Sequence, residues 1–127
     1  MNNAKTNQML NNEFVDVRPQ KTTGAGAISF EIVAPTPGKN WSLQRIEIHF
    51  SKASTTSENF VIAKDDVDNA VYDVKYYNND ISTDSVVDIV YIPDKNITLD
   101  ADDKITITYT NTDAATYGIK AYVKPRY

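Results

Sequence analysis

The sequence predicts an all-β domain, an antiparallel β-sandwich with eight or nine strands in a jelly-roll-like arrangement. Three observations support this fold class. Apolar and polar residues alternate in short runs, and these runs are rich in Val, Ile, Thr and Tyr. Asp, Asn, Ser, Thr and Gly separate the runs, as expected for turns. No long segment has the apolar repeat of an amphipathic helix.

A single domain accounts for the length of the chain. With 127 residues it can build one hydrophobic core that buries roughly two-thirds of the surface of the unfolded chain. Residues 1–12 are polar and rich in Asn, which predicts a flexible arm that either stays disordered or orders against a neighbouring subunit. The sandwich is expected to span residues 13–127.

The expected strands follow one another at short spacing. They are residues 13–19 (ending at Pro19), 27–33, 43–50, 59–63, 70–78, 85–93, 96–99, 104–111 and 116–124. In 104–111, Ile105, Ile107 and Tyr109 alternate with Thr and are expected to face the core. Residues 85–93 are apolar on both faces apart from Asp88, which predicts a strand in the middle of a sheet.

Charge and composition disfavour nucleic-acid and membrane partners. Thirteen basic and 17 acidic residues give a net charge of −4, whereas nucleic-acid binding needs a concentrated basic face. A local basic cluster is expected only near the C-terminus, at Lys120, Lys124 and Arg126. The sequence has no signal-peptide pattern, no apolar run of roughly 20 residues and no cysteine. We therefore expect synthesis in a cytoplasm and a fold without disulfides.

The motifs of common enzymes are not found. The single histidine, His49, alternates with Arg45 and Glu47 on the polar side of its strand, which indicates a solvated residue. No nucleophile elbow surrounds Ser42 or Ser51, the serines with which His49 could formally build a Ser-His-Asp arrangement. Most aspartates lie in turns, where their side chains bond nearby backbone N–H groups. We expect no enzymatic activity, no catalytic residue and no cofactor.

The segment KDDVDN (residues 64–69) is the strongest candidate for a metal site. An EF-hand counted from Asp66 places Asp68 at position three, but Ala, Val and Tyr then occupy positions five, six and twelve. The EF-hand motif is therefore excluded, and the segment is expected to be a hairpin turn between two strands. The alternative is a looser calcium site that joins Asp66 and Asp68 to Asp100 or Asp102.

Aromatic residues suggest a second kind of site. The chain has eight tyrosines, one tryptophan and four phenylalanines. Exposed aromatic rings can stack on the faces of sugars, and Trp41, Tyr76 and Tyr77 are the candidates for such a platform. Trp41 follows PGKN at the start of a strand, where packing is an equal alternative. Tyr72, Tyr109 and Tyr117 alternate with core positions and are expected to be structural.

Four segments between Trp41 and Gly118 carry a family resemblance: WSLQRIEIHFSKASTTSENFVI, AVYDVKYYNNDIS, VVDIVYIPD and DDKITITYTNTDAATYG. They resemble small β-sandwich proteins encoded among the structural genes of tailed bacteriophages. Relatives often have glycine in the hairpin after the FVI strand, where this chain has DDVDNA. The resemblance rests on strand and turn pattern, so it implies no site residues.

The resemblance implies a virion component of the capsid-decorating, head-fibre or connector-associated type. Such a protein would be made in the host cytoplasm, form homo-oligomers and bind other virion proteins, such as the major capsid protein, by surface complementarity. The alternative is a carbohydrate-binding sandwich that binds glycans through exposed aromatics. A glycosidase is disfavoured, since it would need two close carboxylates across a cleft.

Overall fold

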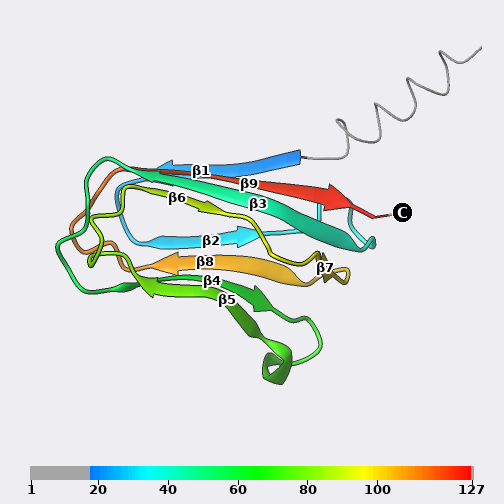
Figure 1. The fold of residues 1–127 in the computed structure, drawn as a ribbon. Coiled ribbons are helices and arrows are strands. Elements are labelled where there is room, and N and C mark those ends of the chain that lie inside the picture. The colour runs from blue at the N-terminus through cyan, green and yellow to red at the C-terminus, as the bar shows by residue number, and fades with distance from the viewer. Residues whose placement is uncertain (1–17, 127) are drawn as a thin grey trace, which may run out of the picture.

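The computed structural model describes residues 18–126, which fold into two antiparallel sheets packed face to face (Figure 1). Sheet A contains β1 (Arg18–Gly24), β9 (Tyr117–Pro125), β3 (Trp41–Phe50) and β6 (Asp88–Tyr91) in that order, and β7 (Ile97–Leu99) also pairs with β3. Sheet B contains β2 (Ile28–Ile32), β8 (Lys104–Tyr109), β4 (Asn59–Asp65) and β5 (Val74–Asp80). The predicted all-β sandwich is confirmed, with nine strands in the described residues.

The strands pair in a nested order. β4 pairs with β5, β3 with β6, β2 with β8 and β1 with β9, so each pair encloses the one before it along the chain. The resulting long ribbon is wound on itself, which brings β9 beside β3 and β8 beside β4. This arrangement is the jelly roll. No helix in residues 18–126 has the length and apolar content of a membrane span.

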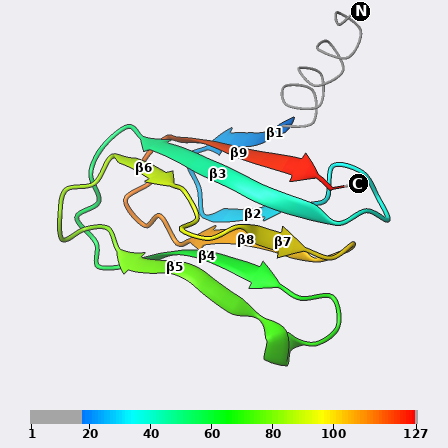
Figure 2. The ribbon, with the colours of Figure 1, turned by 45° about the vertical axis from the view of Figure 1, so that its right-hand side comes forward.

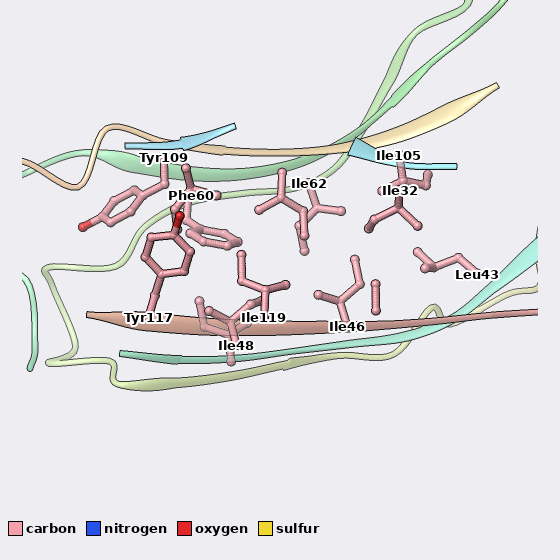
Figure 3. Packing of buried hydrophobic residues seen from close by; sticks show 14 of the residues in the cluster. Ile32, Leu43, Ile46, Ile48, Phe60, Ile62, Ile105, Tyr109, Tyr117 and Ile119 are labelled. Carbon is pink, nitrogen blue, oxygen red and sulfur yellow. The ribbon is translucent and has the colours of Figure 1, made fainter. Parts of the chain in front are cut away.

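The core fills the space between the two sheets. Figure 3 shows Ile62, Ile105 and Tyr109 of sheet B facing Ile48 and Ile119 of sheet A. All five are buried, because alternate residues of each strand point inward. The inward face predicted for residues 104–111 is therefore confirmed, and alternate residues of the final strand, β9, are buried as well.

Three expected strands differ in the structure. The expected strand 70–78 begins only at Val74, as β5, because residues 70–72 form a 3₁₀ turn. β1 continues through Pro19 to Gly24, because it is an edge strand that pairs only with β9, and an edge strand tolerates a residue without an N–H group. Residues 85–93 form only the four-residue edge strand β6, which pairs with β3. Because β6 is the last strand in the order of sheet A, the prediction of a central strand is wrong, and the outward-facing Val90 is 60% exposed. The expected arm (1–12) and residues 13–17 lie outside the described residues.

Carboxylates hold together the loops at one end of the sandwich. Asp113 accepts hydrogen bonds from the backbone N–H of Thr55 and from Thr56 Oγ1, the latter at 2.7 Å. Asp80 accepts from the hydroxyl of Ser57 and from Ser82 Oγ (2.7 Å). The bond from the Thr55 N–H is the main cause that lowers the pKa of Asp113 to about 2. The bond from Ser57 likewise lowers the pKa of Asp80 to about 2.

These two carboxylates predict where acid destabilises the fold. Their pKa values are lower in the folded chain, so the stability they contribute is complete above the ordinary aspartate pKa near 3.8 and is lost as pH falls toward 2. We expect the melting temperature to change little from pH 7 to about pH 4 and to fall between about pH 4 and pH 2. Asp113→Asn should lower the melting temperature at pH 7 and make the acid decrease shallower. An unchanged acid profile in this variant would contradict the assignment.

Candidate functional site

The loop between β4 and β5 is folded by its own acidic side chains. Asp66 accepts a hydrogen bond from the Asp68 N–H (2.9 Å), and Asp73 accepts one from the Asp66 N–H (2.8 Å). Asn69 Oδ1 accepts from the Val71 N–H at 3.0 Å and caps a single 3₁₀ turn, η1 (Ala70–Tyr72). The KDDVDN segment is therefore part of a hairpin turn, as predicted. We call residues 66–74 the hairpin tip.

A neighbouring turn fixes the hairpin tip in place. Asp103 is buried in the turn between β7 and β8, and its Oδ1 accepts from the Val67 N–H at 2.8 Å. Lys64 on β4 lies 3.1 Å from a carboxylate oxygen of Asp66. The backbone bond from Asp68, followed by the bond from Lys64, lowers the pKa of Asp66. The tip is thus an ordered structure, held by bonds from two directions.

The alternative calcium site has no support in the structure. The residue that reaches the hairpin tip from the neighbouring turn is Asp103, whereas Asp100 and Asp102 were the expected partners of Asp66 and Asp68. Asp103 uses one carboxylate oxygen for the Val67 N–H and the other for the Asp100 N–H (3.0 Å). Within residues 18–126, no three His, Asp or Glu side chains are grouped so as to hold a metal ion.

The hairpin tip presents apolar side chains to solvent. Seven large apolar residues are exposed in the described chain, and four of them belong to the hairpin tip: Val67, Val71 and Tyr72 on the loop, and Val74 at the start of β5. Val71 is 78% exposed and Tyr72 is 58% exposed. The prediction that Tyr72 is a structural residue in a strand is wrong, because the cap by Asn69 turns residues 70–72 into η1 and rotates this ring outward. No other segment of the described chain carries as many exposed large apolar residues.

The three candidate aromatics do not form a sugar-binding platform. Trp41 has no exposed surface, because it starts β3 between β7 and β9, where its side chain packs in the core. Tyr77 is half-buried and makes an edge contact with Phe60, with ring centroids 6.2 Å apart. Tyr76 is also half-buried, and burial raises its pKa. Trp41 lies in sheet A and the tyrosines in sheet B, so the structure does not bring the three together.

A groove lies on the outward face of sheet A, where β1, β9, β3 and β6 run side by side. Its volume is about 840 Å³. Gly118 on β9 lies in its middle, opposite Thr23 on β1 and His49 on β3. A Cβ atom at Gly118 would meet no atom within 4 Å, so the missing side chain leaves the centre of the groove open. We call this feature the Gly118 groove.

The charges that line the Gly118 groove balance, with Lys21 and Lys120 against Glu47 and Asp88. Each carboxylate has a partner: Glu47 accepts from Arg45 Nε at 3.3 Å, and Asp88 lies 2.6 Å from His49 Nδ1. Lys21 and Lys120 lie opposite each other on β1 and β9, and neither forms an ion pair with another residue of the described chain. Lys120 also lies opposite Glu47 on β3, so a carboxylate borders the two ammonium groups.

The basic cluster predicted near the C-terminus lies partly on this face of sheet A. Lys120 and Lys124 both point outward from β9, and Arg45 on β3 lies over the ring of Tyr122 at 4.0 Å. Sequence reasoning identified Lys120 and Lys124 but missed the groove, which depends on pairing between four strands. The signal that could have revealed it is Gly118 itself, since glycine inside a strand often marks a close approach.

Comparisons with known proteins give no further information about these two surfaces. No protein-family model matches the chain, and no curated protein matches it either.

Proposed function

We propose that this protein is a non-enzymatic structural component of a bacteriophage particle, which acts by oligomerising and by docking on other virion proteins. The observation that carries the proposal is the hairpin tip, a segment with four exposed apolar side chains whose backbone is fixed by hydrogen bonds. Jelly rolls serve as capsid and lectin domains, and the family resemblance favours the first of these uses.

The order of the tip supports a role in protein binding. Exposed apolar patches mark interaction sites, because covering them with a partner removes apolar surface from water. A loop already held by Asp66, Asp73 and Asp103 loses little conformational freedom when a partner covers it. An apolar loop of this kind is therefore suited to specific docking.

The alternative, a carbohydrate-binding sandwich, loses its aromatic platform because Trp41 is buried and Tyr76 and Tyr77 are packed against the core. A glycan array tests the alternative directly. The structural role predicts no glycan bound by the chain, whereas binding that survives Tyr76→Ala and Tyr77→Ala would place a sugar site elsewhere on the molecule.

Mass spectrometry of purified particles tests the proposal. We expect the chain in phage particles produced by a host that carries its gene, and we expect Val71→Glu to remove it from them. Val71 is exposed, so this variant should keep the wild-type melting temperature. Val33→Glu is the matched control, since Val33 is also exposed but lies outside the tip, and it should still be incorporated. Absence of the wild-type chain from the particles would overturn the proposal.

A further inference from the structure

We infer that Asp103 is a positioning residue for docking, because its bond to the Val67 N–H sets the direction in which the hairpin tip presents Val71 and Tyr72. This inference rests on the proposed function and assigns a role in it to a residue that is itself buried and touches no partner. It is carried by the difference between the bonds that shape the tip and the bond that orients it.

The bonds inside the tip fix its shape. Asp66 accepts from the Asp68 N–H, and Asp73 accepts from the Asp66 N–H. Asn69 accepts from the Val71 N–H. All three bonds join residues of the tip to one another. They would therefore survive if the tip turned as a unit relative to the two sheets.

A single side chain ties this unit to the rest of the sandwich. The Val67 N–H donates to Asp103 Oδ1 at 2.8 Å, and the two residues are 36 positions apart in the chain. Within residues 18–126, no other side chain from outside the β4–β5 hairpin forms a hydrogen bond with the tip. Figure 2 shows why this contact is possible, since the loop after β4 and the turn between β7 and β8 lie at the same end of the sandwich.

The turn between β7 and β8 holds the Asp103 carboxylate in one orientation. Asp103 Oδ2 accepts from the Asp100 N–H at 3.0 Å, and the Asp103 N–H donates to the Asp100 carbonyl at 3.2 Å. The side chain is only 3% exposed, and each of its oxygens is used by a backbone N–H group. Asp103 Oδ1 is therefore a fixed acceptor to which the tip is attached.

The charge of Asp103 also acts on the base of the tip. Lys64 lies 3.1 Å from a carboxylate oxygen of Asp66, and these two side chains are only 20% and 10% exposed. The bond to Asp66 is the main cause that raises the pKa of Lys64, and the charge of Asp103 adds to it. A neutral side chain in place of Asp103 would weaken this attraction as well as the bond to the Val67 N–H.

Asp103→Asn tests the role of the carboxylate. Asparagine keeps the shape of the side chain but has one acceptor oxygen for two N–H donors, so one of them would face an NH₂ group. We expect hydrogen exchange of the Val67 amide, measured by NMR, to become about tenfold faster or more. Unchanged exchange of the Val67 amide in this variant would overturn the inference.

Asp113→Asn is the matched control. It also removes a carboxylate that joins two loops, but the partners Thr55 and Thr56 precede β4, whereas the tip follows it. This variant should lower the melting temperature and leave the exchange of the Val67 amide as in the wild type. The two variants therefore separate a loss of stability from a loss of orientation of the tip.

Incorporation into phage particles gives the second readout. We expect several-fold less Asp103→Asn than Asp113→Asn in purified particles. If Asp103 only stabilised the fold, the two variants would be incorporated in proportion to their melting temperatures. That result, with the wild type present in particles and Val71→Glu absent from them, would leave the proposed function standing and overturn this inference. Absence of the wild-type chain from particles would overturn both.

The wild-type chain offers a check that needs no variant. The Val67 amide should exchange more slowly than the Val71 amide, because its acceptor, Asp103, is buried, whereas Asn69, the acceptor for Val71, is exposed. Equal exchange rates of these two amides would contradict the attachment of the tip to Asp103.

Discussion

Ile107→Asp is expected to unfold the domain. Ile107 lies in the middle strand pair of sheet B, opposite Phe30 on β2 and Ile62 on β4, and has no exposed surface. A carboxylate at this position would be buried among apolar side chains without a partner, which costs several kcal/mol. The total stability of a domain of this size is only about 5–15 kcal/mol. Circular dichroism should show no cooperative thermal transition.

The neighbouring residue supplies the control. Thr108 points outward from the same strand and is exposed, so Thr108→Asp should change the free energy of unfolding by less than about 1 kcal/mol. A wild-type melting temperature in Ile107→Asp would mean that β8 has the opposite phase and that Thr108 faces the core. The pair of variants therefore tests the register of sheet B as well as the burial of one side chain.

Asn111→Ala is expected to have the second largest effect on stability. Asn111 is buried just after β8 and has a left-handed backbone with φ of 54°. Its Nδ2 donates to the carbonyls of Gly26 and Ala115 (3.0 Å each), and its Oδ1 accepts from the Ala115 N–H. Alanine would lose these bonds and would be strained at this φ, which together lower the free energy of unfolding by about 3 kcal/mol or more.

Asn111→Gly separates the two causes. Glycine adopts a positive φ without strain but cannot supply the side-chain bonds. It should therefore destabilise the domain less than alanine does, and the difference between the two variants in urea denaturation measures the backbone strain. Equal stabilities would show that the hydrogen bonds account for the whole effect. Wild-type stability in both variants would contradict the structural role of Asn111.

The alternation of polar and apolar residues predicted most of the fold, because the apolar positions of a half-buried strand show which of its faces points into the core. Residues 104–111 and 116–124 are examples. The prediction failed where burial depends on neighbours that are distant in sequence. The apolar run 85–93 indicates a central strand by composition, yet β6 is an edge strand. Similarly, Pro19 does not end β1, because the pairing on only one side of that strand makes its missing N–H harmless.

The candidate site was less predictable than the fold. The local chemistry of the hairpin tip could be anticipated, since turn aspartates bond nearby N–H groups in many proteins. The exposure of Tyr72 could not be anticipated from the sequence. It depends on the cap by Asn69, which makes residues 70–72 a 3₁₀ turn where the alternation had predicted a strand. The lining of the groove could not be predicted beyond the signal of Gly118, because Lys21 and Lys120 are far apart in the chain and become neighbours only through the register of β1 and β9.

The nested strand pairing has a consequence for folding kinetics. Only the β4–β5 pair is closed by a short loop, whereas each further pair encloses all the pairs before it. Closing a long loop costs more entropy than closing a short one, so the hairpin is expected to form first and the β1–β9 pair last. Such long-range pairing places folding in the range of about milliseconds to seconds. The acid-capped loop that presents Val71 and Tyr72 would then also be the nucleus from which the chain folds.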